Sequence, residues 1–109
     1  MKVTAFNCSA RRDGNTAILL NAALAEIKAA GIETELAQLA GRPLRGCTGC
    51  GGCGRNRDGR CVLPDDGFNG LMAKMAASDG VLIGSPTYFA DVTAEAKALI
   101  DRAGMVAIS

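Results

Sequence analysis

The strongest indication of the fold is the stretch Lys2-Val-Thr-Ala-Phe-Asn-Cys-Ser-Ala-Arg-Arg-Asp-Gly-Asn-Thr16, in which a short apolar strand leads into a loop of small and cationic residues. Apolar side chains then recur at helical spacing from Asn15 to Ala30, and Gly31 follows as a helix stop. Free backbone N–H groups and the positive end of a helix dipole both face such a loop. The stretch therefore predicts a strand–loop–helix unit that binds an anion.

Side chains of this loop supply the donors that a phosphate needs. Ser9 and Thr16 carry hydroxyls, and Arg11 or Arg12 offers a guanidinium fork. The loop matches neither the ATP-binding pattern G-x-x-x-x-G-K-[ST] nor the dinucleotide pattern G-x-G-x-x-G, so it predicts a site for the single phosphate of a mononucleotide. The alternative is that Asn15 or Thr16 only caps the helix and that the arginines are solvated.

The length of 109 residues fits one domain, and the net charge of +1 gives no reason to expect nucleic acid as a partner. No basic leader precedes an apolar stretch, and no apolar run approaches the roughly 18–20 residues of a membrane span. We therefore expect a cytoplasmic protein without membrane contact. The sequence contains no histidine, the usual general base, and we assign no catalytic residue.

The rest of the chain divides into alternating strands, helices and loops. We expect a strand near a sheet edge at 32–39, an irregular segment at 40–64, a helix from 65 or 66 to 80, a buried strand at 81–84, a loop at 85–90 and a helix from 91 or 93 to about 104. This order predicts an α/β fold, a doubly wound parallel sheet of about three strands with helices on both faces. If the first strand is central, loops 8–16 and 85–90 flank one crevice.

Helical spacing also predicts which side chains the last two helices bury. The expected core residues are Phe68, Leu71, Met72, Met75 and Ala76 in one helix and Ala96, Leu99, Ile100 and Ala103 in the other. Asp65 or Asp66 is expected to cap the first of these helices, and neither has an evident titratable partner.

Four of the five cysteines gather in one segment, Cys47-Thr-Gly-Cys50-Gly-Gly-Cys53 followed by Cys61. Successive two-residue gaps place three thiolates on one tight loop, which is typical of iron–sulfur proteins. Zinc sites more often pair two separate C-x2-C knuckles, and unligated thiols are the other alternative. Cys8 stands apart, and we expect it to be a buried thiol, although a nearby helix N-terminus could make it reactive.

The loop Ser85-Pro86-Thr87-Tyr88-Phe89 places a rigid proline and two aromatic rings after a buried strand. These side chains suit contact with a flat ring system. The alternative is a turn that drops Tyr88 or Phe89 into the core.

Together, these three stretches resemble the flavodoxin-like NADPH-dependent FMN reductase family, in particular its iron–sulfur flavoprotein branch. The resemblance covers residues 1–104 and rests on three motifs in the same order. The first loop of the family is G-S-P-R-x-x-G-N-T, in which Cys8 and Ala10 here replace a Gly and a Pro. The positions that match are Ser9, Arg11, Asn15 and Thr16.

The resemblance implies that the matching residues, with the adjacent Ala17, bind the phosphate of FMN. It further implies a 4Fe–4S cluster on Cys47, Cys50, Cys53 and Cys61. The family segment G-S-P-x-Y-F appears as Gly84-Ser-Pro-Thr-Tyr-Phe89, so Pro86, Thr87, Tyr88 and Phe89 are expected to wrap the isoalloxazine ring. Residues 1–109 would then form the N-terminal portion of a flavodoxin-like FMN-binding domain, with a cysteine-rich loop at 40–64.

Relatives in this family continue beyond the length of this sequence with further strands and helices. We therefore expect the apolar strand 81–84 to lie at an open sheet edge. Either the chain is an incomplete version of the domain, or it forms a homo-oligomer in which another subunit covers this edge.

Three functions follow from these motifs. The favoured one is an FMN-dependent oxidoreductase that exchanges electrons with a 4Fe–4S cluster, uses NAD(P)H as a possible electron donor, and serves a redox partner protein or a small-molecule electron acceptor. The second is a cluster-free NAD(P)H-dependent flavin or quinone reductase. The third is a zinc-stabilised binding module without catalysis.

Overall fold

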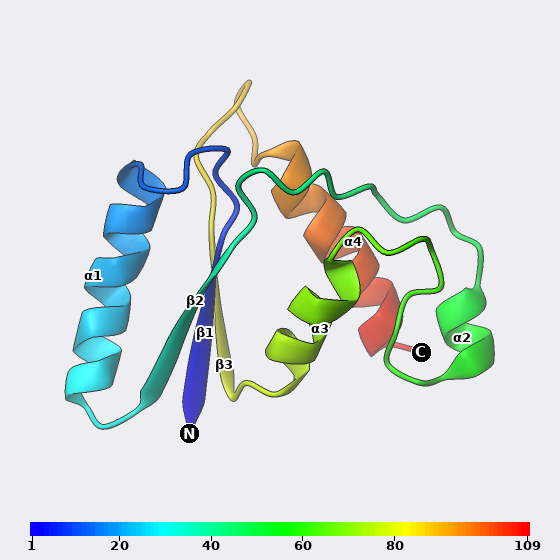
Figure 1. Ribbon diagram of the computed structural model, residues 1–109, viewed down its shortest axis with the longest axis horizontal. Coiled ribbons are helices and arrows are strands. Elements are labelled where there is room, and N and C mark those ends of the chain that lie inside the picture. Colours follow the sequence, from blue (N-terminus) through cyan, green and yellow to red (C-terminus); the bar gives the residue numbers. More distant parts are fainter.

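The structure is a computed structural model that describes all 109 residues. Its elements, in chain order, are β1 (Lys2–Asn7), α1 (Asn15–Ala29), β2 (Glu33–Gln38), α2 (Gly52–Asn56), α3 (Phe68–Ala76), β3 (Gly80–Gly84) and α4 (Ala94–Ala107). The strands form one parallel sheet in the order β2-β1-β3 (Figure 1). This confirms the predicted α/β class, with the first strand in the centre.

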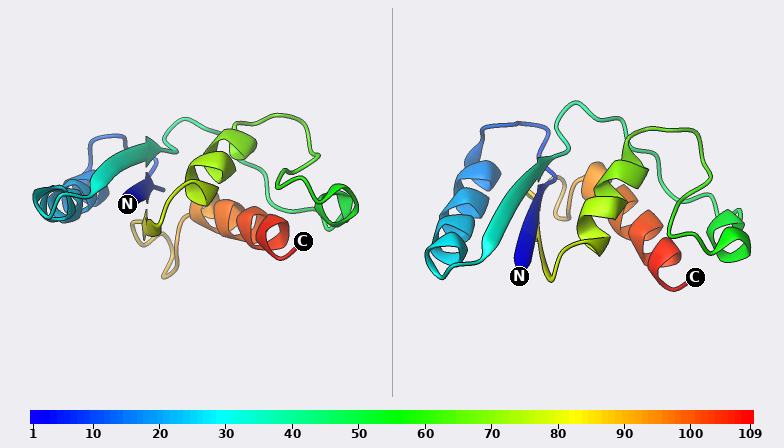
Figure 2. Two further views of the ribbon diagram at one scale, coloured as in Figure 1. Left: turned by 90° about the horizontal axis from the view of Figure 1, so that it is seen from below. Right: turned by 60° about the horizontal axis from the view of Figure 1, so that its bottom comes forward.

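The sheet separates two helical layers (Figures 1 and 2). Ala5 of β1 packs with Leu20 and Leu24 of α1 on one face. Phe6, the next residue of the strand, packs with α3 and α4 on the other face. This follows from the two-residue period of a strand, which turns successive side chains to opposite faces. A central strand with apolar residues on both faces therefore requires a helix on each side.

The larger core lies between the sheet, α3 and α4. Phe6, Phe68 and Leu99 are completely buried there. Burying each such side chain contributes about 1.5–3 kcal/mol. This core fixes the position of α4, which matters because both ends of α4 border candidate sites.

Three of the predicted boundaries and two predicted segments are corrected. Helix α3 ends at Ala76 and not at Gly80, which begins β3. The strand predicted as buried has no fully buried residue, because it lies at the sheet edge. The cap of α3 is Gly67, whose φ of +91° suits glycine, and not Asp65 or Asp66. The last helix continues past Gly104 to Ala107, because Gly104 does not adopt a left-handed conformation and Val106 beyond it is buried. The segment 40–64 contains the short helix α2, which contacts α4.

The predicted core is also corrected in part. Ala76 is exposed, and Ile100 retains 43% of its surface. On α4 it is Arg102 that is buried, at 2% exposure, beside the expected Ala103. No helix is both long enough and apolar enough to span a membrane.

Candidate functional site

The first candidate site is a cavity at the carboxyl ends of β1 and β3. Loop 8–16 and the loop after β3 both line it, because β3 lies directly beside β1. Figure 1 shows both loops at the same end of the sheet. The lining residues are Ser9, Arg11, Gly14, Asn15, Thr16, Pro86 and Tyr88. The predicted juxtaposition of the two loops is thus present, and we call this cavity the crevice.

The start of α1 leaves donors free to face the crevice. The N-cap is Gly14, and no side chain caps the helix. The alternative in which Asn15 or Thr16 serves as the cap is therefore wrong. Unpaired N–H groups and the helix dipole favour an anion at this position.

Asn7, which the sequence analysis missed, holds the first loop in place. Its buried side-chain amide donates to the carbonyls of Arg11 and Arg12, at 3.5 and 3.3 Å, and to Oε1 of Gln38 at 2.9 Å. Its Oδ1 accepts from the backbone N–H of Ser9 at 3.2 Å. A polar residue at the end of a buried strand was the available signal for this role.

The second loop is anchored at its base and exposed at its tip. Thr93 donates from Oγ1 to the carbonyl of Cys8 at 2.7 Å, and its backbone N–H donates to Ser85 Oγ at 3.0 Å. At the tip, Tyr88 and Asp91 pair through backbone hydrogen bonds. Phe89 is fully exposed and has a φ of +45°. The alternative in which the aromatic rings enter the core is therefore wrong.

Not every predicted crevice residue lines the cavity. Thr87 and Phe89 are exposed and lie outside its lining, and Ala17 is buried beneath it at 4% exposure. Tyr88, which is 47% exposed, is the aromatic side chain that borders the crevice.

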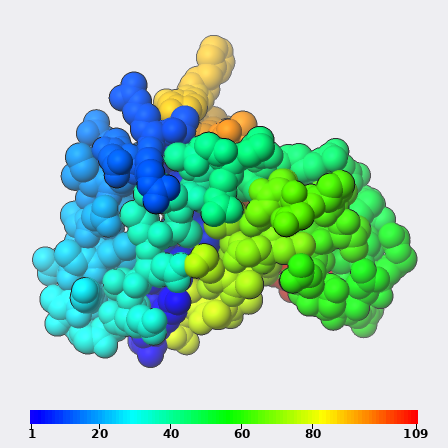
Figure 3. Space-filling view, in the orientation of Figure 1, coloured from blue at the N-terminus to red at the C-terminus, as the bar shows by residue number.

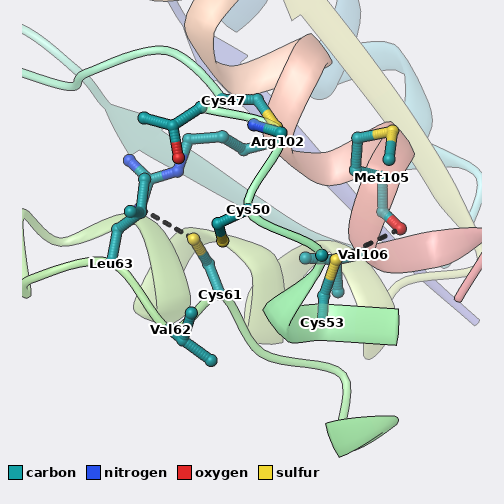
Figure 4. Close-up of a pocket in the computed structure, with 12 residues that line it drawn as sticks. Cys47, Cys50, Cys53, Cys61, Val62, Leu63, Arg102, Met105 and Val106 are labelled. Carbon is teal, nitrogen blue, oxygen red and sulfur yellow. Dashed lines mark hydrogen bonds between the residues drawn. The ribbon is translucent and has the colours of Figure 1, made fainter. Parts of the chain in front are cut away.

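The second candidate site is a cavity beside the end of α4, lined by all four clustered cysteines (Figure 4). We call it the cysteine cavity. Met105, Val106 and Arg102 of α4 complete its wall. Cys53 donates from Sγ to the carbonyl of Met105 at 3.7 Å. All five cysteines of the chain are free thiols.

A glycine allows the first part of the cysteine segment, at Gly52, to lie against the last part, at Val62. Gly52 is buried, and a Cβ on it would lie 2.4 Å from a methyl carbon of Val62, the residue after Cys61. Gly49 and Gly51 have φ values of +69° and +75°, which turn the loop tightly between Cys47 and Gly52.

The thiols differ in their electrostatic surroundings. A hydrogen bond from the backbone of Gly52 lowers the pKa of Cys50, and Thr48 and Arg55 add to the effect. Burial raises the pKa of Cys8 to about 11. The clustered segment therefore contains a thiol that ionises more easily than an ordinary cysteine, whereas Cys8 is buried in the core, as predicted, where ionisation is disfavoured.

Arg102 is a buried cation that the sequence analysis did not single out as a site residue. Its Nη1 donates to Asp66 Oδ2 at 2.6 Å and to the carbonyl of Arg45 at 3.1 Å, and its guanidinium lies 4.3 Å from the ring centroid of Phe68. Asp66 is thus an ion-pair partner as well as a turn residue, contrary to expectation. Burial opposes the ionisation of Asp66, yet the hydrogen bonds from Arg102 and backbone amides keep its pKa below the usual value.

The cysteine cavity gathers four thiols, which is the donor set of either an iron–sulfur cluster or a zinc ion. No group of three candidate ligands is drawn together for a metal ion in this structure. Arg102 also lines the cavity, and its Nη2 lies 3.4 Å from Cys61 Sγ. Thiolate ligands with a cationic donor nearby are compatible with a cluster.

The two candidate sites lie at opposite ends of α4. Thr93, the cap of the helix, is tied to the crevice, whereas Met105 and Val106 border the cysteine cavity. The separation along the helix axis is about 18 Å. Figure 3 shows the same arrangement on the surface, with the two crevice loops at one end and the cysteine segment, in green, at the other.

A family model described as NADPH-dependent FMN reductase matches residues 1–108. The chain belongs to this family. It is 42% identical over 102 residues to an iron-sulfur flavoprotein of Methanocaldococcus jannaschii, covering 94% of this chain and 51% of the relative. It is 38% identical over 102 residues to an iron-sulfur flavoprotein of Archaeoglobus fulgidus, covering 94% of this chain and 45% of the relative.

A third relative is an iron-sulfur flavoprotein of Methanosarcina thermophila, 35% identical over 102 residues, with 94% of this chain and 52% of the relative covered. The chain thus spans about half the length of the relatives it matches. Membership of this family confirms the predicted resemblance and the flavodoxin-like class of the fold.

Proposed function

We propose that the chain is an FMN-dependent oxidoreductase that binds FMN in the crevice and a 4Fe–4S cluster in the cysteine cavity. The observation that carries the proposal is that loop 8–16 and the loop after β3 line one cavity. The family match and the names of the relatives support it and favour it over a zinc-binding module.

The phosphate of FMN would lie at the start of α1. Ser9, Arg11, Asn15 and Thr16 surround this position, and the uncapped helix offers backbone N–H groups there. A phosphate accepts several hydrogen bonds and is attracted by both the helix dipole and a guanidinium group. Ala17 would contribute through its backbone, since its side chain is buried.

The ring system would lie against the second loop. Pro86 and Tyr88 line the crevice, and the exposed Thr87 and Phe89 of the same loop would contact the ring from outside the present lining. A rigid proline beside aromatic side chains provides a flat apolar surface.

Bound FMN and the cluster would supply electron-transfer chemistry, while the chain binds, orients and tunes them. Cys47, Cys50, Cys53 and Cys61 would be the thiolate ligands. NAD(P)H is the proposed electron donor, and a redox partner protein or a small molecule is the proposed acceptor. A cytoplasmic location, in which the thiols would stay reduced, and a homo-oligomer are further parts of the proposal.

The test begins with protein purified anaerobically. We expect its visible spectrum to show both flavin and cluster absorption after reconstitution with FMN, iron and sulfide, and about four irons per chain. A colourless protein that takes up neither would refute the proposal. Flavin uptake without iron would instead identify a cluster-free reductase.

A matched variant tests the phosphate site itself. Thr16→Asp places a carboxylate in the first turn of α1, which is favourable for the helix but repels a phosphate. We expect FMN affinity to fall at least tenfold, about 1.4 kcal/mol, while affinity for riboflavin, which lacks the phosphate, is unchanged. Equal weakening of both ligands would contradict a phosphate site at this position.

A further inference from the structure

We propose that Arg102 is a positioning residue for the cysteine cavity, which fixes Cys61 in place and raises the reduction potential of a cluster bound there. Its Nη2 donates a hydrogen bond to Cys61 Sγ at 3.4 Å. The inference rests on the proposed cluster, and assigns to one buried side chain the control of that cluster.

Arg102 joins the three parts of the chain that meet at the cavity. It belongs to α4, it bonds the carbonyl of Arg45 just before the first clustered cysteine, and it pairs with Asp66 just after the last. Asp66 also accepts from the backbone N–H of Arg45 at 3.1 Å. The guanidinium and its carboxylate partner thus hold both ends of the cysteine segment against one helix, as a fork of several donors allows.

Cys61 has a second support that keeps its sulfur near Arg102. Asn69 of α3 accepts from the backbone N–H of Cys61 and donates to its carbonyl, at 2.8 and 2.9 Å. The backbone of Cys61 is therefore held by α3, and its side chain is held by α4. This leaves Cys61 more constrained than Cys47 and Cys50, which are exposed.

The bonding of Arg102 is incomplete without a further acceptor. The side chain is 2% exposed, it lines the cavity, and its Nε is buried without a hydrogen-bond partner. An unpaired buried donor is costly, and native structures usually satisfy it. The one contact of the guanidinium with a cavity sulfur is the Nη2 bond to Cys61, so a negatively charged group held by that sulfur would strengthen the bonding of a side chain that is not fully satisfied.

The effect on potential follows from charge. Reduction adds one electron to the cluster without breaking a bond, which makes the group more negative. A hydrogen bond to a ligand sulfur and a buried positive charge both stabilise the more negative state. Removing them therefore favours the oxidised cluster.

The experiment measures the reduction potential of the cluster in reconstituted protein. Dithionite supplies the electron, and the amount of reduced cluster is followed by electron paramagnetic resonance. Arg102→Lys keeps a positive charge for Asp66, so the fold is retained, but one ammonium cannot reach every partner. A double variant, Arg102→Gln with Asp66→Asn, removes both charges together and leaves no unpaired ion. The control is Arg57→Gln, because Arg57 is exposed and bonds the carbonyl of Gly54 at 3.4 Å but no sulfur and no cysteine carbonyl.

We expect both Arg102 variants to take up iron and to show a reduction equilibrium about tenfold less favourable than wild type, about 59 mV for one electron. Arg57→Gln should change it less than threefold, because water screens an exposed charge. Unchanged potentials in both Arg102 variants would overturn the inference and leave the proposed cluster intact. An equal shift in Arg57→Gln would overturn it as well, since any nearby charge would then suffice.

The remaining outcomes are also decisive. If the wild type takes up no cluster, the proposed function of the cysteines fails, and the inference falls with it. If neither Arg102 variant folds, as judged by the thermal unfolding of the metal-free proteins, Arg102 serves the fold alone and the inference is overturned.

Discussion

Asn7 shapes the crevice through one buried amide. It donates to two carbonyls of loop 8–16 and to Gln38, and it accepts from Ser9. An amide can do both, whereas a carboxylate of the same shape can only accept. Position 7 therefore requires the N–H donors of an amide, and a side chain of the same size without them does not suffice.

Replacing Asn7 with Asp should destabilise the protein. The change places a carboxylate against three acceptor oxygens. The carbonyl of Arg11 and Oε1 of Gln38 lose their donor, and the carbonyl of Arg12 keeps only the bond from Gln38 Nε2 at 3.2 Å. We expect the free energy of unfolding in urea to fall by about 1–3 kcal/mol. Gln38→Ala is the control, because it removes one of these partners from a half-buried position and should cost less. Equal stability of Asn7→Asp and wild type would contradict this account of the loop.

Cys8 should be unreactive in the folded protein. Only a thiolate is alkylated, and with a pKa of about 11 the ionised fraction of Cys8 at pH 8 is about one part in a thousand. Iodoacetamide at pH 8 should therefore modify Cys50, whose pKa is lowered, and spare Cys8. Mass spectrometry of peptides gives the readout, and in denaturant every cysteine should react. Rapid native modification of Cys8 would show that the strand end opens.

Among the elements, the cysteine segment depends on a close approach of two short stretches. A Cβ at Gly52 would overlap Val62, so Gly52→Ala should push Cys61 away from Cys50 and Cys53. We expect iron uptake after reconstitution to fall at least twofold. Val62→Ala alone should have little effect, and combining it with Gly52→Ala should restore uptake because the contacted methyl groups are gone. Failure of the double variant to recover would show that the backbone of Gly52, and not the space beside it, is required.

The elements that periodicity predicts well are those that bury a long apolar face. The spacing of Leu20 and Leu24 gave α1, and the alternation around β2 gave an edge strand. Helix α2 lacks any such face and exists because Gly52 and Cys53 pack against Val62 and α4. Tertiary contacts of this kind have no local signal, so the segment could only be predicted as irregular.

The site residues likewise divide into those that a local sequence motif predicts and those that depend on contacts distant in the sequence. Loop 8–16 and the four cysteines carry motifs that can be recognised one by one, and the strand order then brings each set to one cavity. Asn7, Thr93 and Arg102 act through partners distant in the sequence, up to 85 residues away for Thr93. A charged residue on an otherwise apolar helical face is the one signal that could have found Arg102.

Across residues 1–109 as a whole, β3 is an edge strand with exposed apolar side chains. Its neighbour is β1 on one side only, and Val81 and Ile83 retain 38% and 43% of their surface. An edge strand with apolar side chains and unpaired backbone groups readily pairs with another chain.

We therefore expect residues 1–109 to self-associate through β3. Ile83→Lys places a charge on that edge strand and should weaken association at least tenfold, as measured by sedimentation velocity. The matched control is Ile18→Lys on α1, where Ile18 is 62% exposed on a helix and not on the edge strand, so the same change should leave association unaltered. A monomeric wild type, or equal weakening by both variants, would show that the open edge of β3 is not the contact.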